Sequence, residues 1–288
     1  MNDLIIDTLG DVASFRLDAG QRPSASAIDA YRTDGVVCLR EAVGPQWLSV
    51  VESGIEESMR TATFDDGHSD KISNEGDEGF FFFDEMMWRH IEPFRQFAMD
   101  SHVPDMVKEL LETESLVFYY DFLLIKTPGC FSGKTPWHQD HSYYPLHGRK
   151  IVNCWVALDH IPKETSLRFV RGSHTAEKVY RQISFNPDKE YANVSQALSA
   201  PPPIDENPEE FDVITCDLQP GDTLIWNSRM FHSAPGNHLS TRRAAISTSW
   251  LGDDVTYHNV AQQTDPPDRG ENLVEGGSME CASFPRVR

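Results

Sequence analysis

Two residues in the stretch TPWHQDH, His138 and Asp140, have the types and the spacing of metal ligands. Successive side chains of a β-strand point to opposite faces, so His138 and Asp140 would lie on one face of such a strand. An imidazole and a carboxylate placed in this way are two of the three ligands in the 2-His-1-carboxylate set of non-haem iron oxygenases. The tripeptide alone also fits an ordinary surface strand or turn, so the rest of the chain must supply a second histidine.

His232 is the best-placed third ligand. It ends the strand-like stretch TLIWNSRMFH and directly precedes the turn SAPGN. A jelly roll can bring such a distant strand end beside the strand of His138. Other histidines lack this combination, because they would point away from His138 or lie at strand exits and in a turn, and we interpret them as hydrogen-bonded or solvated: His141, His160, His174 and His238.

Arg243 suggests what else binds beside the metal. It lies eleven residues after His232, inside the apolar strand-like stretch RRAAISTSWL. A buried guanidinium is costly unless an anion meets it, and its fork fits a carboxylate in a bidentate manner. Iron with an open coordination face and an inward arginine predict a pocket for 2-oxoglutarate, whose far carboxylate would pair with Arg243. The adjacent Arg242 would face the opposite way, toward the surface.

The elements expected to position these residues begin with helices. We expect a short helix starting at residues 24–27 and a second from about 45 to 60, with an apolar strand at 36–39 between them. Residues 63–78 are polar and rich in Gly and Asp, which is typical of a mobile loop. The stretch FFFFDEMMWRHIEPFRQFAMDS is expected to continue into a helix that ends near Glu112.

From Leu116 onward the pattern is typical of β-strands separated by Pro and Gly turns. The expected strands are SLVFYYDFLLIK, IVNCWVALDHI, SLRFV, VITCDL, TLIWNSRMFH and RRAAISTSWLG. We therefore expect a mainly β fold with flanking helices, a double-stranded β-helix (jelly-roll, cupin-like) core buttressed by N-terminal helices. Residues 1–288 would form a single domain, with a helical part at about 24–114, a jelly-roll core at about 115–257 and an irregular C-terminal tail. We expect lids over the site at residues 63–77 and 176–212.

The composition narrows the class of partner. The chain has 288 residues and a formal net charge of −20, which disfavours nucleic acid and anionic membranes and leaves a small molecule as the expected partner. Its five cysteines are widely spaced, and we interpret them as reduced thiols. No basic signal-like start and no membrane-spanning apolar run are present, so we expect a cytoplasmic protein. Nothing in the sequence indicates an oligomeric state.

Three stretches together resemble the phytanoyl-CoA dioxygenase family of Fe(II)/2-oxoglutarate-dependent oxygenases: PWHQDHSYYPLHGRKIVNCWVALDHI, SLRFVRGSH and PGDTLIWNSRMFHSAPGNHLSTRRAAIS. The resemblance is close over about residues 116–252. It implies Fe(II) ligands at His138, Asp140 and His232 and a 2-oxoglutarate carboxylate anchor at Arg243. It also implies that Lys126 helps to hold the cosubstrate and that Trp155 lines the same pocket. The turn RGSH and Ser166 depart from the family pattern, and we expect them to alter a loop rather than the chemistry.

Further residues are expected around the same pocket. Ser247 lies four residues after Arg243, so strand alternation would place it beside the same carboxylate. Residues just beyond the HQD tripeptide would line the substrate mouth: Tyr143, Tyr144 and Arg149. The aromatic stretch at residues 78–90 would form either a wall for an apolar ligand or the core under the helices, and burial statistics favour the core.

The resemblance implies hydroxylation of a C–H bond of a small-molecule metabolite, with O2 and 2-oxoglutarate as cosubstrates and release of succinate and CO2. No catalytic residue is expected beyond the metal centre. A redox-neutral cupin-like metalloenzyme is one alternative, but it would need neither an inward Arg243 nor Lys126. A non-catalytic metal-binding protein of the same fold is another, although all three ligands are present here.

Overall fold

The computed structural model describes residues 9–64, 68–185, 192–194 and 198–288. The described strands form two large sheets and a two-stranded ribbon. The large sheet has the order β2 (Ser14–Arg16), β3 (Val36–Arg40), β12 (Thr223–Asn227), β9 (Ile151–Ala157), β14 (Arg243–Leu251), β6 (Val117–Lys126), β5 (Phe81–Glu85), β4 (Ser69–Ile72). The smaller sheet has the order β1 (Gly10–Asp11), β11 (Val213–Thr215), β10 (Arg168–Val170), β13 (His232–Ala234), β7 (Thr135–His138). The ribbon pairs β15 (Thr256–Tyr257) with β8 (Leu146–His147).

The large sheet and the smaller sheet pack face to face, as expected of a jelly roll. One core cluster joins side chains from both of them, among them Trp155 and Trp226 of the large sheet and Phe169 and Ile214 of the smaller one. Strand β9 shows how alternation divides the two faces, because Trp155 lies in this inner cluster whereas Val156 packs on the outer side. The expected jelly-roll fold is confirmed.

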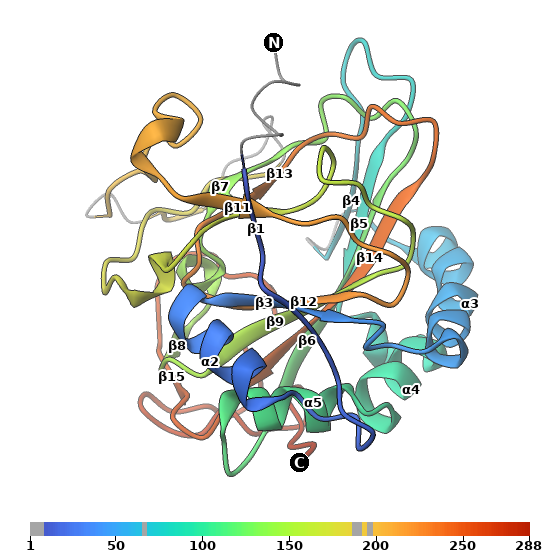
Figure 1. Ribbon diagram of the computed structural model, residues 1–288. Helices are drawn as coiled ribbons and strands as arrows, with labels where there is room; N and C mark the ends of the chain where they lie inside the picture. The colour runs from blue at the N-terminus through green and yellow to red at the C-terminus, as the bar shows by residue number, and fades with distance from the viewer. Residues whose placement is uncertain (1–8, 65–67, 186–191, 195–197) are drawn as a thin grey trace.

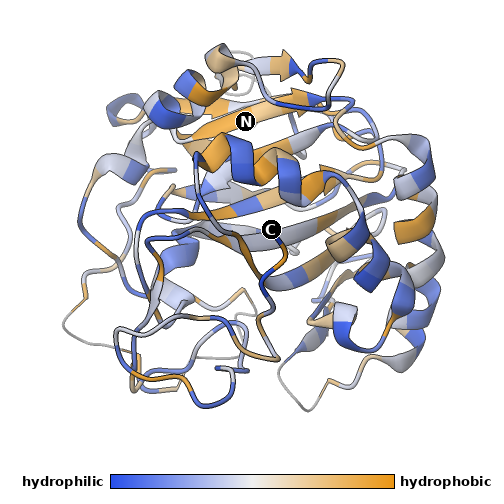
Figure 2. Ribbon diagram, turned by 90° about the horizontal axis from the view of Figure 1, so that it is seen from below, coloured by the Kyte–Doolittle hydropathy of each residue, from blue (hydrophilic) through white to orange (hydrophobic). Residues whose placement is uncertain are grey.

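Within the described residues, four α-helices cover the other face of the large sheet: α2 (Ala25–Asp34), α3 (Pro45–Thr61), α4 (Glu92–Asp100) and α5 (Val103–Leu111). Figure 1 shows α3, α4 and α5 on the side of the large sheet away from β7 and β13. Their apolar side chains and the outward-facing residues of the large sheet form the largest core cluster. Figure 2 shows the strands as rich in hydrophobic residues, whereas helices and loops are mixed or hydrophilic.

The first two helices lie where the sequence predicts them, and local signals explain both. The hydroxyl of Ser24 caps α2 by accepting from the amide of Ala27, and Gly35 ends the helix with a left-handed φ of 83°. Helix α3 begins with Pro45, at a position where the missing amide hydrogen would have no partner in any case.

The stretch between α3 and α4 differs from the prediction. The expected loop contains β4, and the aromatic stretch expected to continue into a helix begins with the strand β5. Strand β5 pairs along its whole length with β6, so tertiary pairing decides the conformation of an apolar run that fits either type of element. The helix expected to end near Glu112 is divided into α4 and α5, and α5 ends at Leu111.

Among the described residues, no helix has both the length and the apolar character needed to cross a membrane.

Candidate metal centre and cosubstrate pocket

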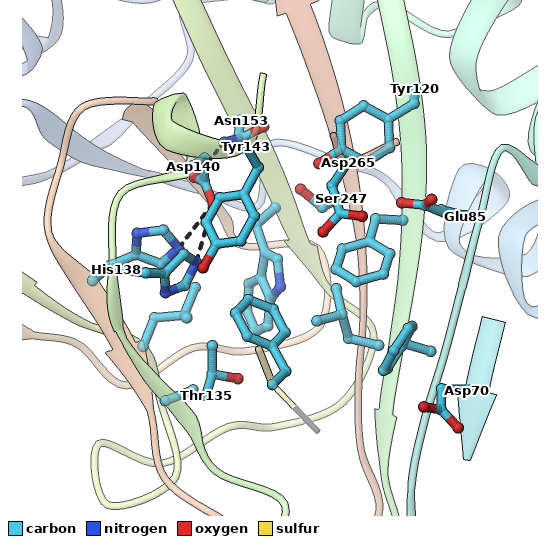
Figure 3. A pocket seen from close by; sticks show the side chains of 18 of the residues that line it. Asp70, Glu85, Tyr120, Thr135, His138, Asp140, Tyr143, Asn153, Ser247 and Asp265 are labelled. Atoms are coloured by element: carbon cyan, nitrogen blue, oxygen red, sulfur yellow. Dashed lines mark hydrogen bonds and ion pairs between the residues drawn. The ribbon is translucent and has the colours of Figure 1, made fainter. Parts of the chain in front are cut away.

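A cavity of about 440 Å³, here called the central cavity, opens between the two large sheets. Figure 3 shows His138 and Asp140 at one side of it and Glu85 and Asp70 at the other. The described residues that line it are Ser69, Asp70, Phe83, Glu85, Tyr120, Phe122, Leu124, Thr135, His138, Asp140, Tyr143, Tyr144, Asn153, Trp155, Leu167, Ser184, Phe185, Trp226, His232, Ala234, Arg243, Ser247, Gln263 and Asp265.

His138, Asp140 and His232 meet in this cavity. His138 ends β7 and is paired in register with His232, which begins β13. Oδ1 of Asp140 lies 3.2 Å from Nε2 of His138 and 3.5 Å from Nε2 of His232. The three ligand atoms all lie within 4.8 Å of one another, so together they could hold one metal ion.

Asp140 reaches this position by a different route from the predicted one. Strand β7 ends at His138, and Asp140 begins the short 3-10 helix η2 (Asp140–Tyr143). The chain turns here because the amide of His141 donates to the carbonyl of Ser228 at 2.9 Å. The same turn directs His141 away from the cavity, where its Nε2 lies 2.9 Å from Nη2 of Arg229. Burial, reinforced by Arg229, lowers the pKa of His141 to about 3, and this imidazole takes no part in the cluster.

Contacts behind the cluster fix how each side chain faces the cavity. Nδ1 of His138 lies 2.8 Å from the carbonyl of Pro136, and Nδ1 of His232 lies 3.2 Å from that of Met230. Because a carbonyl only accepts, Nδ1 carries the proton in both rings and the lone pair of Nε2 faces Asp140. Burial lowers the pKa of His232 to about 4, which leaves its imidazole in the neutral form that binds metals.

Asp140 is held by two donors that the sequence reasoning missed. Its Oδ2 accepts from Nδ2 of Asn153 at 2.6 Å and from Nε1 of Trp226 at 2.8 Å, which leaves Oδ1 facing the two histidines. Burial alone would raise the pKa of Asp140, but the facing histidines and the hydrogen bond from Trp226 lower it overall. One signal for Asn153 was available, since it lies two residues before Trp155 and therefore on the same strand face.

Arg243 begins β14 and points into the same cavity. It is 2% exposed, and its guanidinium carbon lies 5.2 Å from the centroid of the Trp155 ring. Within the part of the chain that the structure describes, its Nε and Nη2 have no hydrogen-bond partner. Burial lowers the pKa of Arg243 to about 10, so it remains a cation at neutral pH. Ser247, on the same face of β14, is paired with Trp155 and also lines the cavity.

The neighbouring cations are neutralised or bonded elsewhere. Arg242 faces outward, where its Nη1 meets Glu52 at 2.7 Å and its Nε meets Asp159 at 3.0 Å. Lys126 is fully buried and donates to the carbonyl of Pro235 at 2.9 Å. Burial and the nearby Arg243 hold the pKa of Lys126 well below its ordinary value. Lys126, on β6, is paired in register with Arg243 of β14. It is not among the described residues that line the central cavity.

Of the three substrate-mouth candidates, two line the cavity. Tyr143 donates from its hydroxyl to the carbonyl of Ile183 at 2.7 Å, and the hydroxyls of Tyr144 and Tyr120 lie 3.0 Å apart. Arg149 does not line the cavity as predicted. Its side chain is 57% exposed and pairs with Glu177 at 3.2 Å. The chain leaves the cavity through β8 and a turn at Gly148, with a φ of 124°, before β9 begins.

The aromatic stretch serves both of the roles considered for it. Phe81 and Phe82 are buried in core clusters, whereas Phe83 and Glu85 line the cavity. The two expected lid segments also contribute to the wall through four described residues: Ser69, Asp70, Ser184 and Phe185. Parts of those segments, residues 65–67, 186–191 and 195–197, lie outside the described residues.

A jelly roll that brings a 2-His-1-carboxylate cluster together with a buried arginine defines the class of non-haem iron, 2-oxoglutarate-dependent dioxygenases. The sequence model of the phytanoyl-CoA dioxygenase (PhyH) family matches residues 31–245. The chain belongs to this family and is a 2-oxoglutarate-dependent dioxygenase.

Individual relatives agree with this assignment. A probable phytanoyl-CoA dioxygenase of Caenorhabditis elegans is 22% identical over 250 residues, which are 83% of this chain and 72% of the relative. Among solved structures, the non-haem α-ketoglutarate-dependent carbocyclase SnoK of nogalamycin biosynthesis is similar, with a TM-score of 0.72 and 19% identity over 94% of this chain and 99% of its own. The epimerase SnoN in complex with Fe3+, α-ketoglutarate and nogalamycin RO gives a TM-score of 0.69 and 19% identity, over 91% and 98%. These two structures share the fold of this chain.

Proposed function

We propose that this dioxygenase hydroxylates a C–H bond of a small-molecule metabolite at the central cavity. The overall balance is substrate, O2 and 2-oxoglutarate giving hydroxylated substrate, succinate and CO2. One oxygen atom enters the substrate and the other enters succinate. The observation that carries the proposal is Arg243, a buried cation with no described partner at Nε and Nη2, facing the same cavity as the metal-ligand cluster.

His138, Asp140 and His232 are proposed to hold Fe(II). Their donor set suits this ion, and their three ligand atoms already converge within 4.8 Å. When bound, the iron supplies the activation of O2 and the oxidation of the cosubstrate. The protein's own part is to present the two Nε2 lone pairs, to keep Asp140 ionised and to exclude bulk water.

Arg243 is proposed to bind the far carboxylate of 2-oxoglutarate. Its unpartnered nitrogens provide the guanidinium fork that suits a carboxylate, and the ring of Trp155 fixes one side of it. Ser247 has a hydroxyl on the same strand face and is proposed to donate to the same carboxylate. Lys126 is proposed to act indirectly, by bonding the carbonyl of Pro235 without touching the cosubstrate itself.

Tyr143 and Tyr144 are proposed to contact the substrate, because they line the cavity next to Asp140. Farther from the metal cluster the wall combines the aromatic rings of Phe83 and Phe122 with the carboxyl group of Glu85. These neighbours suit a compact organic molecule with apolar parts, and candidates that carry a basic nitrogen belong in any substrate screen.

Two rival functions are disfavoured by particular residues. A redox-neutral cupin-like enzyme has no use for Arg243, whose burial without an anion would only destabilise the fold. A non-catalytic metal-binding protein has no need for the cosubstrate anchor or for a cavity of about 440 Å³ beside the cluster. We infer a cytoplasmic location as well, supported by five free cysteines, four of them buried.

The proposal is tested by incubating a metabolite library with the protein, Fe(II) and 2-oxoglutarate under air. Mass spectrometry is expected to detect a product heavier by one oxygen, together with succinate in equal amount. Both should vanish when iron or 2-oxoglutarate is omitted and in the His232→Ala variant. Equal succinate formation by wild type and His232→Ala would contradict the proposed centre.

A further inference from the structure

A second group of metal-ligating side chains lies outside the central cavity. It consists of His147 on β8, His258 just after β15, and Glu275 on the segment that follows. Oε1 of Glu275 lies 3.1 Å from Nδ1 of His258 and 3.6 Å from Nε2 of His147. All three ligand atoms lie within 4.8 Å of one another, and the two imidazole rings face each other with centroids 4.0 Å apart.

The backbone around this group is held by hydrogen bonds, so the convergence is built into the fold. Strands β8 and β15 are paired, with Thr256 opposite His147, and the amide of His258 donates to the carbonyl of Pro145 at 2.8 Å. Oε2 of Glu275 accepts from the amide of Asn259 at 2.7 Å. Glu275 therefore has one oxygen committed to the backbone and the other directed at both histidines.

We propose that His147, His258 and Glu275 bind a divalent transition-metal ion of the Zn2+ type, with water completing the coordination. Zinc bonds to nitrogen and oxygen are about 2.0–2.2 Å long, so a tetrahedral site places its ligand atoms about 3.3–3.6 Å apart. The separations of 3.1 and 3.6 Å bracket this spacing. Both imidazoles face the same oxygen, Oε1 of Glu275.

The surroundings favour a cation. The chain carries a formal net charge of −20, which raises the concentration of cations at its surface. The three side chains are 57%, 40% and 56% exposed, so an ion reaches them from solvent without a change of fold. Two imidazoles and one carboxylate match the ligand preferences of zinc.

The position of the site indicates what the ion does. His147 follows the segment of Tyr143 and Tyr144, and His258 precedes the segment of Gln263 and Asp265; all four of these flanking residues line the central cavity. The two segments are already linked near the cavity, where the amide of Asp265 donates to the carbonyl of Tyr143 at 3.1 Å. At the far end, an ion bound by His147 and His258 adds a side-chain link to the backbone pairing of β8 with β15, so it stabilises one wall of the cavity rather than acting on substrate.

The test uses untagged full-length protein with the catalytic cluster removed, as the His138→Ala/His232→Ala double variant. After treatment with a chelator, the protein is dialysed against ZnCl2, and bound zinc is measured by inductively coupled plasma mass spectrometry. One zinc per chain is expected in the double variant, and none when Glu275→Gln is added. Glutamine keeps an acceptor for the amide of Asn259, so this change removes the anionic ligand while preserving the local hydrogen bond.

A second readout covers the case in which the added change perturbs folding. Zinc is expected to raise the melting temperature of the double variant and to leave that of the His147→Asn derivative unchanged, since this exposed residue is replaced without loss of core contacts. A folded double variant that binds no zinc would overturn the proposal. Zinc binding that persists undiminished after both Glu275→Gln and His147→Asn would overturn it equally.

Discussion

His138 and His232 occupy paired positions on the antiparallel strands β7 and β13, and their ring centroids lie 4.1 Å apart. The hydrogen-bond register of the smaller sheet therefore sets the distance between two side chains that are far apart in the sequence. A site built on strands in this way is held more precisely than one built on loops. The pairing makes the separation of these two histidines a property of the sheet itself.

Replacing His232 with alanine is expected to abolish Fe(II) binding, because two ligands remain and the carboxylate of Asp140 loses one of its facing imidazoles. His238→Ala is the matched control, since His238 is an exposed histidine whose Nε2 lies 3.7 Å from Glu164. Iron bound per chain, measured after anaerobic desalting, should fall to background in the first variant and stay at one in the second. Full iron occupancy in His232→Ala would require another ligand set.

Trp226→Phe is expected to weaken iron binding by about 10- to 100-fold, the usual effect of removing a hydrogen bond to a metal ligand. The change deletes the donor to Oδ2 of Asp140, 2.8 Å away, while keeping an aromatic ring in the core. Trp250→Phe is the control, because its indole donates to Thr248, away from the cluster. Equal iron affinities in the two variants, measured by competition with a chelator, would show that this hydrogen bond does not tune Asp140.

Asp121 gives a pH-dependent prediction. Burial, with a contribution from Asp84, raises the pKa of Asp121 to about 8, well above the ~3.9 of an unfolded chain. The native state then binds more protons than the unfolded state between about pH 4 and pH 8, so this group lowers stability as the pH rises through that range.

Asp121→Asn removes the titration and keeps an acceptor for the amide of Trp88, which donates to Oδ2 at 2.9 Å. The melting temperature of the variant minus that of wild type is therefore expected to increase from pH 5 to pH 8. Asp29→Asn, at an exposed position on α2, should show no such trend. A difference that stays constant over this range for Asp121→Asn would mean that the carboxyl group is ionised throughout.

Lys126→Met tests how the second basic side chain acts. Methionine removes the hydrogen bond to the carbonyl of Pro235 while filling a similar volume. Because Lys126 is not part of the described cavity wall, its loss is expected to weaken 2-oxoglutarate binding by less than the loss of Arg243 does. An equal or larger effect would mean that the ammonium contacts the cosubstrate directly.

Those residues of the site whose position follows from their own charge and from the strand pattern could be predicted from the sequence. A charged side chain in an apolar strand, Arg243, and a histidine at a strand end, His232, both face the central cavity. Helix α3 was predictable from its apolar stripe and from Pro45 at its start.

The structural features that the sequence could not predict depend on hydrogen bonds between segments that are far apart in the chain. Phe81–Glu85 becomes a strand because β6 lies beside it, and no local signal distinguishes this outcome from a helix. Asp140 turns out of β7 because Ser228, distant in sequence, accepts from the next amide. Arg149 was misplaced for a related reason, since the course of the chain after Tyr144 is set by the pairing of β8 with β15.

Anaerobic titration of the Fe(II)-loaded protein with 2-oxoglutarate, followed by the charge-transfer band of the chelate, tests the central claim most directly. Wild type is expected to develop the band with one equivalent of 2-oxoglutarate. Arg243→Ala should bind it about 30- to several-thousand-fold more weakly, because breaking a buried charge pair costs about 2–5 kcal/mol. Arg243→Lys should fall between them, since lysine keeps the charge but loses the fork. Arg242→Ala, which alters a surface ion pair, should match wild type. If Arg243→Ala binds 2-oxoglutarate as tightly as wild type, the proposed cosubstrate site is wrong.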